Sequence, residues 1–228
     1  MPLSDAELAA IYLTVSLATI TTVILILLGT PLAWWLARRQ GSIPAAVEAL
    51  VAMPLILPPT VLGFYLLILF APDSGLGRFW FWLTGSQLAF SFSALVIGSV
   101  VYSLPFVVQP LQAAFERVPP GLLQAAATLG APPADQFRSI VLPMSRRTII
   151  VAASQGKAHT VGENGDVLKI GGNIPGETQV HSIALYDYVE SLQFDEAHRL
   201  SALLVVFSIA LLFCIYRMDR GATFKVRA

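Results

Sequence analysis

Long apolar runs alternate with short polar stretches along this chain. Several runs reach or exceed the roughly 20 residues that cross a bilayer as a helix. Backbone groups inside a bilayer must find hydrogen-bond partners within the span, which favours helices. The pattern predicts an all-α polytopic membrane protein, a single domain over residues 1–228, with about five transmembrane helices, or six. The five placed spans are residues 9–35, 47–70, 88–108, 148–170 and 200–216.

The composition supports the same class. Of the 228 residues, 56% are hydrophobic and only 12% are charged, whereas soluble domains carry about 25% charged residues. The formal net charge is zero, which indicates neither a nucleic-acid partner nor an acidic one. The lone Cys214 excludes an intramolecular disulfide. The first apolar run follows an acidic start and is too long for a signal peptide, so we expect it to be retained.

The second apolar run, residues 47–70, contains Pro54, Pro58 and Pro59. Adjacent prolines remove backbone donors, so this run predicts a kink or a break. A break at membrane depth is tolerated where protein or a cavity surrounds it. Alternatively, Pro58 lies near the interface and merely starts a helix. The sequence leaves both interpretations open.

The stretch 71–87 is predicted to be a loop at the membrane surface. It contains Asp73, Gly75, Gly77 and the aromatic cluster Phe79–Trp82. Aromatic residues are enriched at membrane–water interfaces, so the cluster suits an aromatic belt.

The fourth run, residues 148–170, is the least apolar of the five. A lysine near the middle of a membrane helix costs about 2.5–3.5 kcal/mol on insertion scales, and glycines weaken the helix further. The run either faces a pore, where a cavity and neighbouring helices solvate it, or is not a span. Its polar and ionisable side chains include Gln155, Lys157, His159, Glu163, Asn164, Asp166 and Lys169.

Basic residues gather on one side of the membrane if five spans are assumed. Arg38 and Arg39 follow the first span, arginines flank the connection 116–147, and a basic cluster ends the chain. The opposite side holds only Arg78 and Arg199. The positive-inside rule then predicts an external N-terminus, a cytoplasmic C-terminus and a cytoplasmic connection.

The connection 116–147 has a helix–turn–helix pattern that most loops between spans lack. Gly130 predicts the left-handed stop of its first helix, and Pro143 is predicted to end its second. Each helix opens with a proline pair, Pro119-Pro120 and Pro132-Pro133, which suits a first helical turn. Apolar residues recur at helical spacing at Leu122, Leu123, Ala126, Leu129, Phe137, Ile140 and Val141. The pattern predicts docking onto a cytoplasmic partner.

Within this connection, Gln124-Ala125-Ala126, Gly130 and Ile140-x-Leu142-Pro143 follow one another at fixed spacing. Their order resembles the EAA loop of ABC-importer permeases, E-A-A-x3-G-x9-I-x-L-P, with glutamine where the family usually has glutamate. The resemblance implies a MetI-like fold and a loop that inserts into a cytoplasmic ATPase subunit. Glutamine keeps the hydrogen-bonding capacity but loses a charge, so docking is weakened at most. The implied coupling residues are Gln124, Ala125, Ala126, Leu129, Gly130, Ala131, Phe137, Ile140, Leu142 and Pro143.

Two further segments, residues 53–67 and 159–190, extend this resemblance to the molybdate branch of the molybdate/sulfate-type permeases. The run Asn173-Ile-Pro-Gly-x-Thr, followed by a Tyr-Asp pair, is characteristic of that branch. The resemblance implies import of molybdate, or of tungstate or sulfate, across a bacterial inner membrane. Branch members usually have large apolar residues where this chain has Gln155, Lys157, Asn164, Asp166, Lys169 and His181, which indicates drift or an altered or engineered sequence.

The resemblance also implies partners. A cytoplasmic ABC ATPase would bind ATP and magnesium, and an extracytoplasmic oxyanion-binding protein would supply most of the affinity. Two copies of the chain would match a pair of ATPases, so we expect a homodimer embedded in membrane lipid. The subunit itself is expected to be no enzyme and to bind no cofactor. Its only Gly-Lys pair, Gly156-Lys157, lacks the features of a phosphate-binding loop.

Metal binding and catalysis have little support in the sequence. His159, His181 and His198 lack metal-ligand spacing. A membrane enzyme or a scaffold is a possible class without a supporting constellation. An ATP-independent channel or secondary transporter is the stronger rival, but it leaves the docking loop unexplained.

The translocation path is predicted from polar groups and helix breaks within the spans, because such features there are functional by default. A carboxylate such as Glu163 repels an oxyanion, so a structural role suits it better. Asn173 could offer amide donors to an oxyanion, or lie in an ordinary turn. The path candidates are Pro58, Pro59, Thr160, Glu163 and Asn173.

Overall fold

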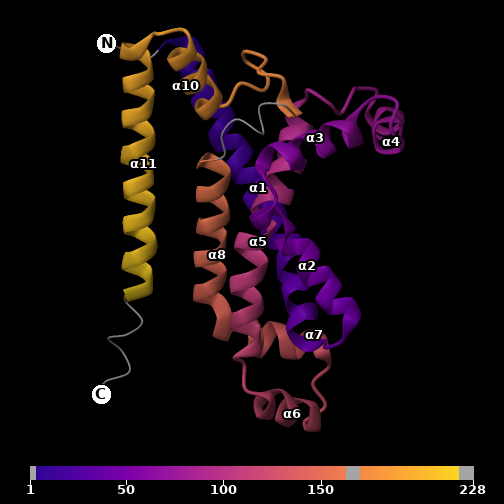
Figure 1. Cartoon of the computed structure of the whole chain (residues 1–228). Helices are drawn as coiled ribbons and strands as arrows, with labels where there is room; N and C mark the ends of the chain where they lie inside the picture. Colours follow the sequence, from indigo (N-terminus) through magenta and orange to yellow (C-terminus); the bar gives the residue numbers. More distant parts are fainter. Residues whose placement is uncertain (1–3, 163–169, 221–228) are drawn as a thin grey trace.

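The computed structural model describes residues 4–162 and 170–220, and these residues contain helices and no strand (Figure 1). This confirms the predicted all-α class. The helices, in chain order, are α1 (Asp5–Arg38), α2 (Ser42–Ile56), α3 (Pro59–Phe70), α4 (Gly75–Thr84), α5 (Phe92–Glu116), α6 (Pro120–Thr128), α7 (Pro133–Gln136), the π-helical turn η1 (Phe137–Val141), α8 (Leu142–Gly162), α10 (His181–Glu190) and α11 (Phe194–Arg220).

Helix α1 begins at a reciprocal cap. The Ser4 hydroxyl accepts from the Glu7 backbone N–H at 3.2 Å, and the Glu7 carboxylate accepts from the Ser4 N–H at 2.6 Å. Two backbone donors at the helix start are thereby satisfied. The helix runs for 34 residues, several more than a bilayer requires, so it extends beyond the predicted span at both ends.

Helices α1, α5 and α8 pack around one core. Its buried side chains include Leu25, Val107, Val108 and Ala152. A glycine allows the close approach of α8, because a Cβ at Gly156 would lie 2.8 Å from the Val107 Cγ2 atom. Contacts as close as this require a residue without a side chain at the crossing point.

The second predicted span is broken. Helices α2 and α3 meet at an angle of 115°, with Pro58 capping α3 and Pro59 in its first turn. The break has the expected cause, because two adjacent residues lack N–H donors. Both interpretations of the prolines therefore hold in part: the run breaks, and the prolines start a helix. The Tyr102 hydroxyl donates to the Pro59 carbonyl and links the break to α5.

The prediction of a plain loop at 71–87 is wrong in part, because α4 lies within it. The Ser74 hydroxyl caps α4 by accepting from the Gly77 N–H at 2.8 Å, and Gly85 ends the helix in a left-handed conformation. A short serine-capped segment of aromatic residues gave too weak a periodic signal to predict a helix. Phe79 and Trp82 are exposed, and their role in an aromatic belt stays a prediction.

Within the described residues, two helices are long and apolar enough to span a membrane, α1 and α5, or three if the bent pair α2–α3 counts as one. Helix α8 does not qualify, in keeping with the polar residues of the fourth run. The count of five spans stays a prediction.

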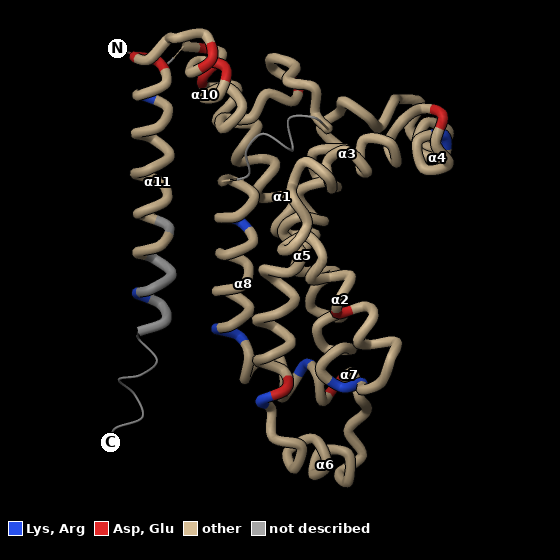
Figure 2. The backbone as a smooth tube through the Cα atoms, in the orientation of Figure 1, with Lys and Arg blue, Asp and Glu red and all other residues tan. Residues whose placement is uncertain are grey.

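The two ends of the molecule differ in charge. Helix α10 and the start of α1 lie at one end, whereas α6, α7 and the end of α11 lie at the other (Figure 1). Basic residues gather around α7 and the adjoining ends of α5 and α8, together with a few acidic ones (Figure 2). The predicted orientation requires such a grouping, and the membrane side of each terminus stays a prediction.

Candidate coupling surface and translocation path

The first helix of the coupling loop, α6, is fixed by its two ends. Pro119 caps it and Pro120 occupies its first turn, where a missing N–H costs nothing. At its end Gly130 has φ of +87°. The Gly130 N–H donates to the Ala127 carbonyl at 2.9 Å, and the Ala131 N–H donates to the Ala126 carbonyl at 3.0 Å. These bonds form a Schellman motif, which confirms the predicted glycine stop.

The two sides of α6 differ in exposure. Leu123 is buried in the core shared with α1 and α5, and Ala126 is half-buried. Leu122 and Leu129 face outward, and 88% of Leu129 is exposed. Since single exposed leucines are common but an apolar stripe on a short helix is not, this face is suited to contact a partner.

The second helix of the loop does not end at Pro143, so that prediction is wrong. Helix α7, η1 and α8 follow one another without interruption from Pro133 to Gly162. The turn η1 shifts the hydrogen-bond ladder by one residue, because the Leu142 N–H donates to the Phe137 carbonyl. Pro143 then lies in the first turn of α8, where its missing donor is tolerated.

Phe137 joins the loop to two long helices. Its ring lies 5.3 Å from that of Trp34 in α1 and 5.9 Å from that of Phe115 in α5. The Trp34 and Phe115 rings are themselves in edge contact at 5.8 Å. Such aromatic contacts are worth about 0.5–1.5 kcal/mol each beyond the area they bury. A force on the loop would therefore reach α1 and α5 directly.

The ten predicted coupling residues divide into two groups by exposure. The exposed group is Gln124, Ala125, Leu129, Gly130 and Pro143. The half-buried group is Ala126, Ala131, Phe137, Ile140 and Leu142. The first group is placed to meet a partner and the second to anchor the loop, although the coupling role of each residue stays a prediction.

The path candidates are scattered in the structure. Pro58 and Pro59 are exposed at the α2–α3 break. Thr160 is only 4% exposed and lies between α5 and α8, where its hydroxyl is 3.1 Å from the Ser103 hydroxyl and donates to the Gly156 carbonyl at 3.0 Å. Glu163 lies outside the described residues.

Asn173 is part of a structured turn. It has φ of +53°, and its Nδ2 donates to the Asp187 carboxylate at 2.8 Å. Gln179 donates to the same carboxylate oxygen at 2.8 Å. The Thr178 hydroxyl closes the turn by donating to the Gly171 carbonyl at 2.7 Å and accepting from the Ile174 N–H at 2.9 Å. The described contact of the Asn173 amide is thus with an internal carboxylate.

A polar cluster between α5 and α8 was not predicted. The His159 ring lies 3.0 Å from the Ser103 hydroxyl through Nδ1, and it stacks on Phe106 at 4.0 Å between ring centroids. The sequence signal for this cluster was weak, because a serine 56 positions from a histidine has no periodic relation to it.

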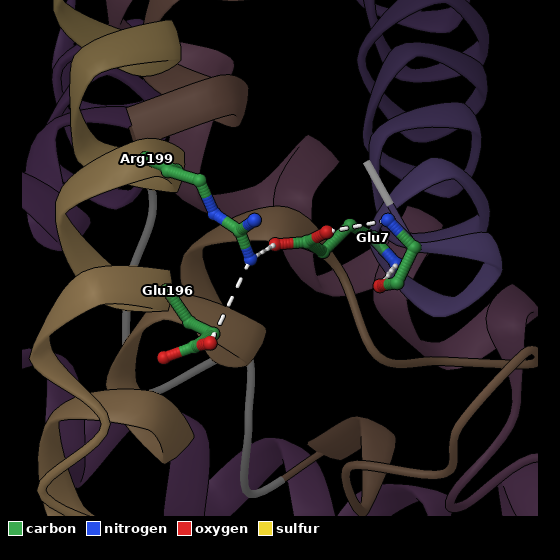
Figure 3. Close-up of polar contacts among 4 residues, drawn as sticks. Glu7, Glu196 and Arg199 are labelled. Carbon is green, nitrogen blue, oxygen red and sulfur yellow. Dashed lines mark hydrogen bonds and ion pairs between the residues drawn. The ribbon is translucent and has the colours of Figure 1, made fainter. Parts of the chain in front are cut away.

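An ion pair between the first turn of α1 and the beginning of α11 was also not predicted. Arg199 in α11 donates to the Glu7 carboxylate in α1 at 3.2 Å, and Glu196 lies 3.8 Å from the same guanidinium (Figure 3). The Glu7 side chain is only 1% exposed, whereas 31% of Arg199 is exposed. A buried carboxylate needs such partners to remain charged.

His181 shows how one unusual polar residue fits. Its backbone N–H donates to the Thr14 hydroxyl at 2.8 Å, and its Nε2–H donates to the Leu200 carbonyl at 3.0 Å. The ring thereby links α10 to α11. The other nitrogen, Nδ1, is buried and has no hydrogen-bond partner among the described residues, a cost that an apolar residue would avoid.

Metal binding finds no support in the described part of the chain, where no three His, Cys, Asp or Glu side chains are placed to hold an ion.

The comparisons with known proteins decide the family. Residues 29–227 match the model of the binding-protein-dependent transport system inner membrane component family. The chain belongs to this family. It is thus a transport component of the inner membrane, and its helical fold is that of the permeases of ABC transporters.

Several proteins of similar sequence are named as permeases of molybdenum or sulfate transport systems. The chain is 50% identical over 220 residues to the molybdenum transport system permease protein ModB of Azotobacter vinelandii, which covers 96% of the chain and 97% of that protein. It is 32% identical over 212 residues to ModB of Escherichia coli K12, covering 92% and 91%. A sulfate transport system permease protein, CysT of Synechocystis, is 31% identical over 82% of the chain and 65% of that protein.

Solved structures of ABC transporters share the fold at low sequence identity. A bacterial ABC transporter that imports alginate matches with a TM-score of 0.74 at 16% identity, over 97% of this chain and 81% of that one. The inward-facing MetNI methionine transporter matches with a TM-score of 0.70 at 19% identity, over 96% and 99%. These matches confirm the predicted MetI-like fold.

Proposed function

We propose that this chain is the membrane-spanning subunit of an ATP-driven importer of molybdate, with tungstate and sulfate as the alternative cargoes. The observation that carries the proposal is the structure of α6. This helix exposes apolar residues and ends at Gly130, and its sequence has the residue spacing of the EAA loop. The 50% identity to a ModB protein over almost the whole chain supports molybdate as the cargo. The similarity to a sulfate permease is lower, at 31%.

Coupling would begin where α6 enters a cytoplasmic ATPase. Leu129 and its neighbours would bury their exposed apolar surface there. Motion of α6 would then reach α1 and α5 through Phe137, whose ring packs on Trp34 and Phe115. Two copies of the chain, each with its own ATPase, would form the path between them, with the N-terminus outside and the C-terminus inside.

The cargo would cross with few strong contacts. A path must release what it accepts, so weak sites favour transport. Asn173 and Thr160 both bond to groups within the chain. This arrangement suits an importer in which a separate binding protein provides the affinity for a tetrahedral oxyanion.

The coupling proposal is tested with Leu129→Glu. Placing a charge at a face that is 88% exposed should leave the fold intact but weaken binding of the ATPase. The matched control is Leu192→Glu, at a leucine that is 72% exposed in the turn before α11. Co-purification of the ATPase and ATP-dependent molybdate uptake into proteoliposomes are measured. We expect a loss of about tenfold or more for Leu129→Glu and little change for the control.

Equal ATPase binding and uptake in both variants would refute the coupling role of α6. Uptake that persists without any ATPase would instead favour a channel or a secondary transporter. Competition of unlabelled tungstate and sulfate against labelled molybdate in the same vesicles ranks the three cargoes.

A further inference from the structure

A cavity of about 170 Å³ lies beside the coupling loop, between the end of α5 and the beginning of α8. It belongs to neither the coupling face of α6 nor the predicted path. The residues that line it are Ala114, Arg117, Val118, Met144, Ser145 and Thr148.

The lining divides into a polar part and an apolar part. Arg117 supplies a guanidinium, and Ser145 and Thr148 supply hydroxyls. Ser145 is only 3% exposed, so its hydroxyl is held within the protein rather than in solvent. Met144 and Val118 form the apolar part, and 54% of Met144 remains exposed. Such a lining fits an amphiphile with an oxyanion at one end.

The guanidinium of Arg117 has no acidic partner within ion-pair distance among the residues that the structure describes. The neighbouring Glu116 is engaged elsewhere, because Gln112 donates to Glu116 at 3.1 Å and to Glu48 at 2.9 Å. Further arginines lie in the adjoining elements, at Arg138 in η1 and at Arg146 and Arg147 in the first turns of α8. The local field therefore favours an anion.

The predicted depth of the cavity relative to the membrane surface indicates which kind of anion could reach it. The third and fourth predicted spans end at about residue 108 and begin at about residue 148. Residues 114–118 and 144–148 then lie where lipid headgroups meet water. This placement at the cytoplasmic leaflet rests on the proposed orientation. Basic pockets between membrane helices on this side bind anionic headgroups.

We propose that this cavity binds the headgroup of an anionic phospholipid. The lipid phosphate accepts hydrogen bonds from Arg117, Ser145 and Thr148, and the start of an acyl chain lies along Met144. An anionic lipid fits better than free phosphate because half of the residues that line the cavity are apolar. A lipid held there touches the ends of α5 and α8 that flank the coupling loop.

The test is native mass spectrometry of the full-length chain in mild detergent, titrated with phosphatidylglycerol or with phosphatidylcholine. The variants are Arg117→Gln, Thr148→Val and, as a matched control at the other end of the molecule, Arg78→Gln. We expect Arg117→Gln to weaken phosphatidylglycerol binding about tenfold, because a charge-assisted hydrogen bond is lost. Thr148→Val, which keeps the shape, should weaken it about threefold. Arg78→Gln should stay within about twofold of the parent.

Several results would overturn the proposal. Equal binding of the two lipids by the parent chain would show that no anion is selected. Unchanged phosphatidylglycerol binding in both Arg117→Gln and Thr148→Val would place the lipid elsewhere. Displacement of the lipid by millimolar molybdate or phosphate, with that displacement lost in Arg117→Gln, would assign the cavity to a free oxyanion.

The lipid test does not depend on transport. It uses no ATPase, binding protein or cargo, so its failure is distinct from a failure of the coupling proposal. Leu129→Glu, which should weaken ATPase docking about tenfold or more, should leave phosphatidylglycerol binding unchanged.

Discussion

Helices α5 and α11 have similar lengths and each contains a long apolar run, but their environments are opposite. Helix α5 has 25 residues, and buried side chains occur along most of it, from Ala94 to Phe115. Helix α11 has 27 residues, and among its described side chains none beyond Leu200 is buried. In Figure 1, α5 lies inside the bundle and α11 stands at its edge.

The difference shows that apolar composition alone does not bury a membrane helix. Helix α5 is packed because glycines on neighbouring helices, Gly29 and Gly156, let the backbones approach Val107. Helix α11 is instead attached near its start by polar contacts, through Arg199 to Glu7 and through the Leu200 carbonyl to His181. Lipid tails are as apolar as leucine, so an apolar helix gains little hydrophobic free energy by moving from lipid onto protein. Hydrogen bonds and ion pairs are therefore an effective way to attach such a helix.

The largest loss of stability is expected from placing a bulky side chain at Gly156, where α8 packs closely against α5. Gly156→Leu places a side chain where the Val107 Cγ2 atom is already 2.8 Å from an ideal Cβ and the Leu25 Cδ1 atom is 3.3 Å away. Overpacking of this kind should cost about 3 kcal/mol. The measurement is the apparent melting temperature of the detergent-purified protein.

Gly162→Leu is the matched control for this change, because no described atom outside its own stretch of helix backbone lies within 4 Å of a Cβ built at Gly162. It lies on the same helix and should be neutral or slightly stabilising, since leucine favours helices more than glycine does. Equal melting temperatures for the two variants would contradict the close packing of α8 against α5.

A smaller effect is expected from detaching α11. Arg199→Gln leaves the buried Glu7 carboxylate with its α1 cap alone, and the cost should be about 2 kcal/mol, because the exposure of Arg199 weakens the pair. Hydrogen exchange followed by mass spectrometry should show faster exchange in the first turns of α11 and unchanged exchange in α5.

Glu7→Gln combined with Arg199→Gln provides the control, because it removes both charges together. The double variant should recover part of the lost stability, which isolates the interaction between the two side chains. Exchange that rises equally in α5 and α11 would mean that the ion pair supports the whole bundle rather than one helix.

The coupling loop was largely predictable from the sequence because local rules determine it. Proline at the start of α6 and glycine after its end have their effects within a few residues, and the structure places both as expected. The break between α2 and α3 follows from Pro58 and Pro59 in the same way. Signals of this kind need no knowledge of the tertiary structure.

The rest depended on contacts that the sequence does not display. Glu7 and Arg199 are 192 positions apart, and nothing local marks them as partners. Pro143 was expected to end a helix. It instead follows a π-helical turn and lies in the first turn of α8, where the missing backbone N–H is tolerated. Thr160 stays a path candidate, but its burial follows from how closely α8 packs on α5, which only the fold determines.

The smallest effect, and the most direct test of the comparison, comes from one substitution made in both helices. Val107→Thr puts a hydroxyl into the core of α5, where the side chain is fully buried, and should cost about 1–2 kcal/mol of stability. Val206→Thr makes the same change in α11, where 66% of the residue is exposed, and should alter stability by less than about 0.5 kcal/mol, because the hydroxyl can bond to its own helix backbone.

Melting temperatures of the two variants, measured in detergent and again in the assembled transporter, show whether α11 is exposed to lipid or covered by protein. A cost for Val206→Thr that appears only in the assembly would mean that a second copy or another subunit covers α11, whereas equal costs in both settings would show that α11 is as closely packed as α5.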